Sequence, residues 1–167
     1  MKELYLFLDF DGVLNGAINN FGRDQNTRFD KNNLSVFDKL IIELQKEYNI
    51  KIIINSSWKI ISSNTEKWVD NFLSKENNPL VKYKDIIINA TPTYHFYDKK
   101  YCCKRFEVES YIVHNFENTS NKEFLILDDE RIKKGYMSFI KVYRTNGEYG
   151  LVNDDIKNIL SLLKEKI

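Results

Sequence analysis

Two kinds of hydrophobic pattern alternate along this chain. Short, nearly continuous apolar runs occupy positions 4–8, 50–54, 85–89, 124–127 and 139–142. Runs of this length are typical of strands that are buried on both faces, as in the centre of a parallel sheet. We therefore expect about five strands, most of them parallel.

The segments between these runs carry apolar residues at helical spacing. They predict helices at 34–48, 60–73, 104–116 and 153–167. Asn33 is the expected N-cap of the first of these helices. In the last helix, Asp154 and Asp155 lie in the first turn, where negative charge interacts favourably with the helix dipole.

This alternation of strands and helices predicts an α/β fold. We expect a three-layer, Rossmann-like, mostly parallel sheet with helices on both faces. The polar segment 15–33 reads as a loop or flap that is too short to fold as a cap domain. Because no linker or repeat divides the sequence, we expect a single domain over 1–167.

Composition and charge narrow the class of protein. Hydrophobic residues make up 43% and charged residues 29% of the 167 residues, which is typical of a soluble globular protein. The net charge of +1 gives no global attraction to nucleic acid or membranes, and the N-terminal apolar run is too short for a signal peptide or a membrane span. Cys102 and Cys103 are adjacent, which rarely suits a disulfide, so we expect reduced thiols and a cytoplasmic location.

Polar groups follow three of the predicted strands directly. Segment 9–12 (DFDG) follows the first strand, segment 55–59 (NSSWK) the second, and segment 128–130 (DDE) the fourth, while Lys104 and Arg105 begin a helix. Ligands of open α/β sheets bind beyond the carboxyl ends of the strands. Carboxylates, hydroxyls and a cation are therefore expected at one rim of the sheet.

These residue types suit phosphoryl transfer. Several carboxylates close together repel one another unless a cation offsets their charge, and Mg²⁺ prefers oxygen ligands of this kind. One aspartate is then available to attack phosphorus, and a second one, two residues further on, faces the same side of an extended chain. That second carboxylate suits a general acid/base, while Ser and Lys side chains hold phosphoryl oxygens.

The same segments carry a family resemblance that covers nearly the whole chain. DFDGVLN, IIINSS, the helix start at Lys104 and FLILDDE resemble, in order, the four motifs of the haloacid dehalogenase (HAD) superfamily of phosphohydrolases. More narrowly, the chain resembles the small HAD domains associated with RNA-repair proteins. In those domains a Ser-Ser-Trp-Arg run follows the second strand and the third motif reads Arg-Gly-x-Glu-Ile. The corresponding runs here are 56–59 (SSWK) and 104–108 (KRFEV), and the Gly-Leu pair at 150–151 also fits.

The resemblance implies a role for each matching residue. Asp9 is the expected nucleophile and metal ligand, and Asp11 the general acid/base, with its backbone carbonyl on the metal. Ser56 is expected to bind phosphoryl oxygens, and Lys104 to neutralise the nucleophile and the phosphate. The remaining expected site residues are Asp128 and Asp129 as metal ligands, and Gly12, Ser57, Lys59 and Arg105 as substrate-binding residues.

The third motif departs from the family pattern, with Lys for Arg at 104 and Arg for Gly at 105. Which of the two bases contacts phosphate is therefore open. We prefer Lys104 because its register against Glu107 matches the motif.

We thus predict a Mg²⁺-dependent phosphohydrolase that removes a phosphate monoester through an aspartyl-phosphate. Without a cap, the open site suits a large substrate such as a polynucleotide end, and basic residues are expected around its mouth: Arg23, Arg28, Lys59, Lys99, Lys100 and Arg105. A 5′-nucleotidase acting on mononucleotides is the alternative. A phosphate-accepting receiver domain fits less well, because the third strand is followed by no acid, and an inactive binding module is the last option. No membrane partner is expected, and the oligomeric state stays open.

Overall fold

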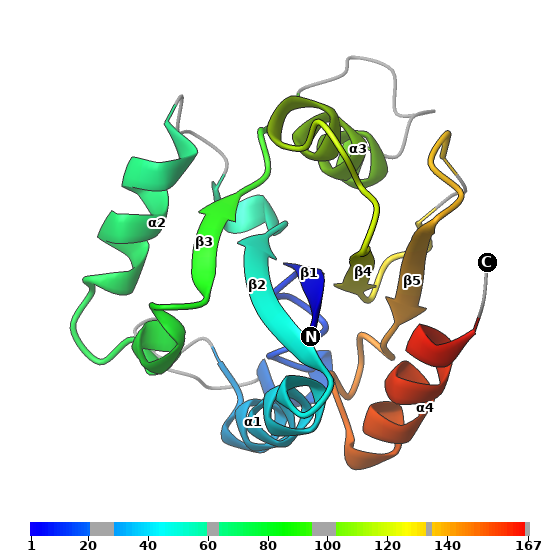
Figure 1. The fold of residues 1–167 in the computed structure, drawn as a ribbon. Coiled ribbons are helices and arrows are strands. Elements are labelled where there is room, and N and C mark those ends of the chain that lie inside the picture. Colours follow the sequence, from blue (N-terminus) through cyan, green and yellow to red (C-terminus); the bar gives the residue numbers. More distant parts are fainter. Residues whose placement is uncertain (21–28, 60–63, 95–102, 133–134, 166–167) are drawn as a thin grey trace.

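A parallel sheet forms the centre of the fold. The computed structural model describes residues 1–20, 29–59, 64–94, 103–132 and 135–165 (Figure 1). The sheet contains β1 (Lys2–Leu8), β2 (Tyr48–Ile54), β3 (Ile87–Ala90), β4 (Lys122–Asp128) and β5 (Ile140–Arg144), in the spatial order β3-β2-β1-β4-β5. Every neighbouring pair is parallel. The predicted fold class is therefore confirmed.

The strand register brings the carboxyl ends of the central strands level. Leu8, the last residue of β1, pairs with Ile54 on β2 and with Leu127 on β4. The pairing continues past the strand ends, since Asp9 N donates to Leu127 O and Asn55 N donates to Leu8 O. The polar residues that follow β1, β2 and β4 therefore leave the sheet side by side.

Helices cover both faces of this sheet. They are α1 (Lys31–Gln45), α2 (Thr65–Leu73), α3 (Cys103–Asn115) and α4 (Asn153–Lys164), with three short 3-10 turns, η1 (Ala17–Asn20), η2 (Ser57–Lys59) and η3 (Pro79–Tyr83). Helices α1 and α4 lie on one side of the sheet and α3 lies on the other (Figure 1).

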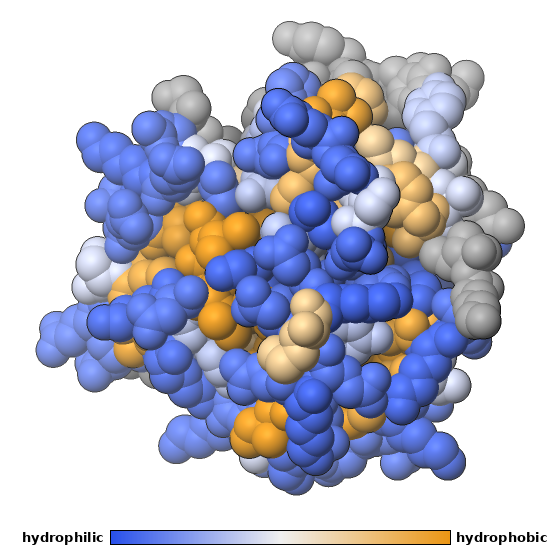
Figure 2. Space-filling model, viewed as in Figure 1, coloured by the Kyte–Doolittle hydropathy of each residue, from blue (hydrophilic) through white to orange (hydrophobic). Residues whose placement is uncertain are grey.

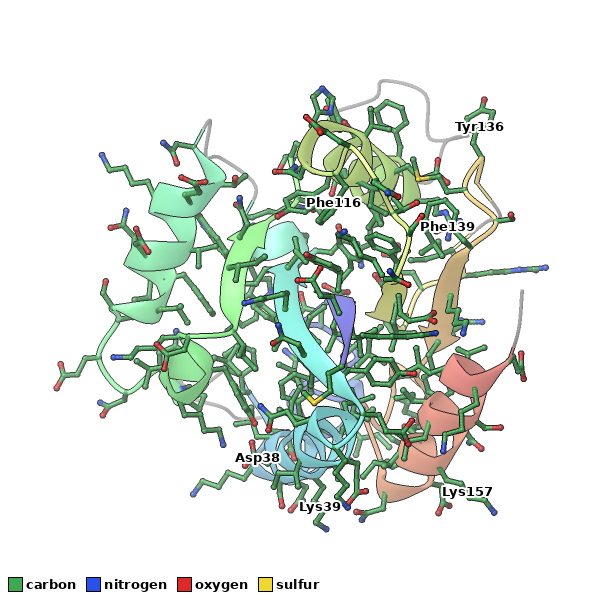
Figure 3. All side chains as sticks on the ribbon, viewed as in Figure 1. Asp38, Lys39, Phe116, Tyr136, Phe139 and Lys157 are labelled. Atoms are coloured by element: carbon green, nitrogen blue, oxygen red, sulfur yellow. The ribbon has the colours of Figure 1, made fainter. Side chains whose placement is uncertain are left out.

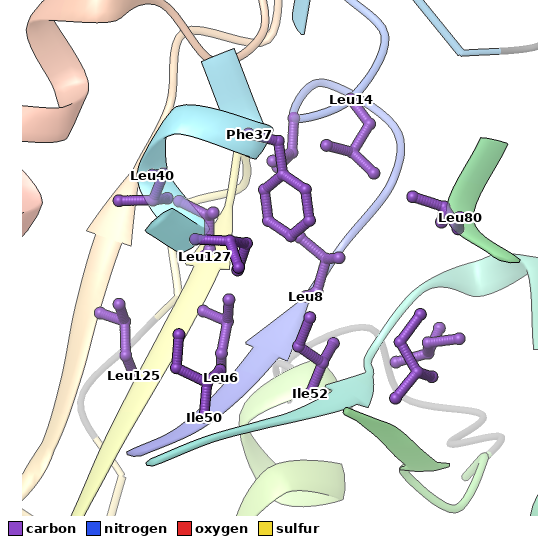
Figure 4. Packing of buried hydrophobic residues seen from close by; sticks show 14 of the residues in the cluster. Leu6, Leu8, Leu14, Phe37, Leu40, Ile50, Ile52, Leu80, Leu125 and Leu127 are labelled. Carbon is purple, nitrogen blue, oxygen red and sulfur yellow. The ribbon is translucent and has the colours of Figure 1, made fainter. Parts of the chain in front are cut away.

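Alternate side chains of β1 fill two separate hydrophobic cores. Leu4, Leu6 and Leu8 join the core beneath α1 and α4. Phe37 of α1 belongs to the same core, and its ring points toward Leu8 (Figure 4). Residues Tyr5 and Phe7 point the other way, into the core beneath α3. This alternation is the period of two expected for a strand that is buried on both faces.

The outer surface is mainly hydrophilic. In the view of Figure 2, polar residues cover most of the face, with hydrophobic side chains exposed in scattered places. In Figure 3, Asp38 and Lys39 of α1 and Lys157 of α4 lie on the outer side of their helices. Of the helices that the structure describes, none has the length and apolar character needed to cross a lipid bilayer.

The first helix begins earlier than the sequence predicts. Asp30, rather than Asn33, is its N-cap, and the Asp30 carboxylate accepts hydrogen bonds from Asn32 N and Asn33 N. The predicted end of this helix is also wrong, because Tyr48 is already the first residue of β2. The second helix begins at Thr65, with Asn64 as its N-cap, while positions 60–63 lie outside the described residues.

Asn33 has a different and more central role. Its side chain is 3% exposed, and its Oδ1 accepts from Gly16 N at 3.1 Å. Its Nδ2 donates to the carbonyl oxygens of Tyr149 and Leu151, both at 2.9 Å. Asn33 therefore ties the loop after β1 to the loop after β5, two segments that both border the carboxyl ends of the strands.

We expect the substitution Asn33→Ala to destabilise the fold. It leaves three backbone groups without their partner, two of them in buried hydrogen bonds and one in a part-buried one, and we expect the free energy of unfolding to fall by about 1–3 kcal/mol. Urea denaturation measures this loss. Asn32→Ala is the matched control, because Asn32 is exposed one position earlier on the same helix and should change stability by less than about 0.5 kcal/mol. Equal effects of the two changes would contradict the role of Asn33.

Candidate active site

Lys104 joins the ends of β1 and β4. It lies in the first turn of α3, and its Nζ donates to Asp9 Oδ2 at 2.6 Å and to Asp128 Oδ1 at 3.1 Å. Glu130 lies further out, with an oxygen 3.9 Å from the same ammonium. One cation thus holds two carboxylates that come from neighbouring strands.

These groups are largely removed from water. Asp9 is 2% exposed and Asp128 is fully buried. Burial, together with the charge on Asp9, raises the pKa of Asp128 to about 7 against the opposing effect of Lys104. Burial also raises the pKa of Asp129. For Lys104, burial alone would lower the pKa, but the charges on Asp9, Asp128 and Glu130 together raise it above its usual value.

Asp9, Asp128 and Asp129 can hold a metal ion. One carboxylate oxygen from each lies within 4.8 Å of the others. Asp9 Oδ1 is buried and has no hydrogen-bond partner, and Asp128 Oδ2, although 3.0 Å from Lys104 Nζ, lies outside hydrogen-bond geometry. Three carboxylates face one ammonium, so negative charge is in excess. A divalent cation with oxygen ligands fits both the unpaired oxygens and this charge.

Two glycines make room for Asp129. A Cβ atom on Gly12 would lie 2.2 Å from Asp129 Cγ, and one on Gly147 would lie 2.3 Å from Asp129 Oδ2. Gly12 also has a φ of +69°, in the left-handed region that favours glycine. Thr145 Oγ1 donates to the carbonyl of Gly12 at 2.8 Å, which fixes the turn against the end of β5. Gly12 therefore shapes the carboxylate cluster through its missing side chain.

Asp11 stands apart from the carboxylate cluster. Its side chain is exposed, and Asn15 Nδ2 donates to its Oδ1 at 2.9 Å. The indole Nε1 of Trp58 donates to Asp11 Oδ2 at 2.7 Å. Asp11 is thus fixed by two neutral donors rather than by Lys104.

The serines follow β2 at the same rim. Ser56 is fully buried directly after the strand, and its Oγ accepts weakly from Trp58 N at 3.4 Å. Ser57 begins η2 and is exposed. The structure thus brings Ser56 to the strand end next to the segment that holds Asp9, and turns Ser57 toward solvent.

Lys59 is directed into the protein rather than outward. It is 3% exposed, and its Nζ contacts Glu107 Oε2 at 2.7 Å and Ser56 O at 3.4 Å. Glu107 also accepts from Tyr94 N and from Thr91 Oγ1. This buried network joins the Ser56 turn to α3, the helix that carries Lys104.

Arg105 does not reach the carboxylate cluster. Its Nε contacts Glu109 Oε1 at 3.0 Å, and its Nη2 donates to Met137 O at 2.6 Å. Met137 N in turn donates to Glu109 Oε1. Of the two bases in the third motif, it is therefore Lys104 that contacts Asp9, while Arg105 fastens the segment before β5 to α3.

Two of the six basic residues that were predicted around the mouth of the site are not exposed there. Lys59 and Arg105 are buried in ion pairs, so they add no exposed positive charge. The other four residues of that prediction, Arg23, Arg28, Lys99 and Lys100, lie outside the described residues.

Sequence reasoning gave no role to four residues that shape the site: Asn15, Trp58, Thr145 and Gly147. Asn15 closes the first motif four positions after Asp11, which is a spacing that suits a side-chain contact across a turn. Trp58 belongs to the SSWK run that carries the family resemblance, but that run gave no partner for its indole. Thr145 and Gly147 follow β5 and carry no local signature, because their contacts are with Gly12 and Asp129.

We expect Mg²⁺ to bind this cluster and to stabilise the fold. A ligand that binds the folded state alone raises the thermal midpoint, and calorimetric titration gives its affinity directly. Asp128→Asn removes one oxygen ligand and should weaken Mg²⁺ binding by about tenfold or more. Without metal, the same variant should be at least as stable as the wild type, because a buried carboxylate is replaced by a neutral amide.

Asp154→Asn is the control for this measurement. Asp154 is exposed in the first turn of α4, so the change removes the same charge away from the cluster. Mg²⁺ affinity should be unchanged in this variant. Tight Mg²⁺ binding by Asp128→Asn would show that the ion binds elsewhere.

Comparison with known proteins adds one match. No curated protein and no solved structure matches the chain. The family profile described as the HAD domain in Swiss Army Knife RNA repair proteins matches residues 5–156, which include Lys104 and all the residues of the carboxylate cluster. Phosphohydrolase chemistry is what this family implies, and the parallel sheet and the acidic cluster agree with it. The chain therefore belongs to the HAD superfamily, as a HAD domain of the RNA-repair type.

Proposed function

We propose that this protein is a Mg²⁺-dependent phosphatase that removes a phosphate monoester through an aspartyl-phosphate on Asp9. The observation that carries the proposal is the state of the Asp9 carboxylate. One of its oxygens is held by Lys104 at 2.6 Å, while the other is buried without a hydrogen-bond partner. A carboxylate that is held in place through one oxygen and has no hydrogen-bond partner on the other is suited both to hold Mg²⁺ and to attack phosphorus.

The reaction follows from the roles of two aspartates. An oxygen of Asp9 attacks phosphorus, and the bond from phosphorus to the leaving oxygen breaks as Asp11 gives that oxygen a proton. In the second step Asp11 takes a proton from water. The water oxygen attacks the phosphorus of the aspartyl-phosphate, which releases inorganic phosphate and restores Asp9.

Lys104 and Ser56 stabilise the negative charge of the phosphoryl group. Lys104 holds the Asp9 carboxylate in position, and its positive charge offsets the negative charge of the phosphoryl oxygens. The Ser56 hydroxyl, buried at the end of β2, is a donor for one of these oxygens. Asp9, Asp128, Asp129 and the backbone carbonyl of Asp11 would hold Mg²⁺, which neutralises charge on the phosphate when bound.

We propose a phosphorylated RNA end as the substrate. The matched family is described from RNA repair proteins. In the part of the connection between β1 and α1 that the structure describes, the 3-10 turn η1 is the single element, and no cap domain covers the site. An open site admits the end of a long polymer. The adjacent Cys102 and Cys103 favour a reducing compartment, so we place the activity in the cytoplasm.

We expect Asp9→Asn to abolish catalysis. The amide is a poor nucleophile, so Mg²⁺-dependent hydrolysis of 4-nitrophenyl phosphate should fall by more than about a thousandfold. Steady-state kinetics measure this, and circular dichroism checks that the variant is folded. Asp154→Asn removes a charge outside the site and should keep the wild-type rate. Similar rates for Asp9→Asn and the wild type would exclude Asp9 as the nucleophile.

We also expect the enzyme to prefer phosphorylated RNA ends over small phosphate esters. In a panel of 5′- and 3′-phosphorylated oligoribonucleotides, mononucleotides, sugar phosphates and phosphopeptides, the oligonucleotides should have the highest kcat/KM, by about tenfold or more. Contacts remote from the reacting phosphate supply that difference. A preference for mononucleotides would identify a 5′-nucleotidase instead, and a preference for sugar phosphates would contradict the open site.

A further inference from the structure

We propose that Trp58 is a positioning residue for Asp11: its indole N–H holds the carboxyl group of the general acid in place against the leaving oxygen. This inference rests on the proposed function, and it assigns to the Ser-Ser-Trp-Lys turn a task distinct from phosphate binding. The contact that carries it joins Trp58 Nε1 to Asp11 Oδ2 at 2.7 Å. The two residues come from the segments that follow β2 and β1.

Within the described part of the chain, both hydrogen-bond partners of the Asp11 carboxyl group are donors. Trp58 Nε1 has a hydrogen to give and no lone pair to receive one. Asn15 Nδ2 donates to the other oxygen at 2.9 Å, and the acceptor atom of Asn15 already receives Gly12 N at 3.0 Å. Neither neighbour is therefore able to take a proton from Asp11. The contacts on both oxygens therefore fix the orientation of the Asp11 carboxyl group.

The indole ring is itself held by packing. Its ring centroid lies 5.2 Å from that of Phe10, edge to face, and 5.2 Å from that of Phe29, in a stacked arrangement. Phe10 is fully buried and stacks on Phe72 of α2. Trp58 is therefore held by an aromatic cluster and in turn holds a carboxyl group that is otherwise exposed. A catalytic group that is fixed in this way is pre-organised for reaction.

Trp58 is a cleaner site for mutation than Asn15. Asn15 also binds Gly12 N, so its removal would disturb the turn that makes room for Asp129. Trp58→Phe removes the N–H and keeps an aromatic ring between Phe10 and Phe29. Trp58→Phe therefore removes the contact that positions Asp11 and leaves the turn at Gly12, which makes room for Asp129, in place.

The dependence on the leaving group is the test. A poor leaving group such as an alkoxide needs a proton as its bond to phosphorus breaks, whereas 4-nitrophenolate leaves without one. We expect Trp58→Phe to lower kcat/KM for an alkyl phosphate at least about tenfold more than kcat/KM for 4-nitrophenyl phosphate. Asp11→Asn, which cannot give the proton at all, should show the same selectivity to a greater extent.

Trp68→Phe is the matched control. Trp68 belongs to the same aromatic cluster, since it stacks on Phe72 at 5.1 Å, but it comes from α2. It is the second of the two tryptophans in the chain. Trp68→Phe should change kcat/KM for the alkyl phosphate and for 4-nitrophenyl phosphate by the same factor, as any general loss of packing would. An equal effect of Trp58→Phe on the two esters would overturn the proposal.

A second measurement does not need catalysis. The two indole N–H groups give separate signals in a ¹H–¹⁵N spectrum, and Trp68→Phe identifies which belongs to Trp58. Asp11→Ala should shift the Trp58 signal and increase its solvent exchange, while the Trp68 signal stays in place. An unmoved Trp58 signal would refute the contact. If the wild type hydrolyses none of the esters, the proposed function fails, and this spectrum alone decides whether Trp58 holds Asp11.

Discussion

The site depends on one electrostatic constraint, the repulsion between carboxylates at the ends of β1 and β4. Parallel pairing sets Asp9 and Asp128 side by side, and burial strengthens their repulsion. The ammonium of Lys104 offsets that repulsion in part, because it contacts both residues. The cation comes from α3, which packs on one face of the sheet. The repulsion between the two carboxylates is therefore reduced only once α3 has docked on the sheet. The remaining excess of negative charge is what prepares the site for a divalent cation.

Helix α3 serves this constraint through three successive contacts. Lys104 reaches the cluster, Glu107 pairs with Lys59 behind the Ser56 turn, and Arg105 with Glu109 fastens the segment at Met137. Breaking a buried ion pair leaves an uncompensated charge, so these pairs resist local rearrangement. The helix therefore fixes the segments that follow β1, β2 and β4, and the segment that precedes β5, relative to one another. A phosphate that binds among them meets groups whose positions are already set.

Local sequence patterns predicted the strands and the acidic cluster because both depend on short-range regularities. Each apolar run is continuous in sequence, and the DFDG and DDE segments follow their runs directly. Parallel pairing of the strands then brings the two acidic segments to the same edge of the sheet. Asn33 and Arg105 were misjudged for the opposite reason. Each is locally typical, as a cap or as a surface base, but each also has partners far along the chain, at Tyr149 and Leu151 for Asn33 and at Met137 for Arg105. Trp58 was recognised as part of the SSWK run, but its contact with Asp11 forms only on folding and could not be read from the spacing of the motifs.

The strand order has a consequence for how the protein folds. Strand β1 lies at the centre and pairs with β4, which the chain reaches after α1, β2, α2, β3 and α3. Forming that pair closes a loop that includes most of the chain, so its entropic cost falls late in assembly. The carboxylates meet as this loop closes, and their repulsion then opposes the final step. Divalent cations present during refolding should therefore accelerate the closure of the central sheet, so that the ion would act as a folding cofactor as well.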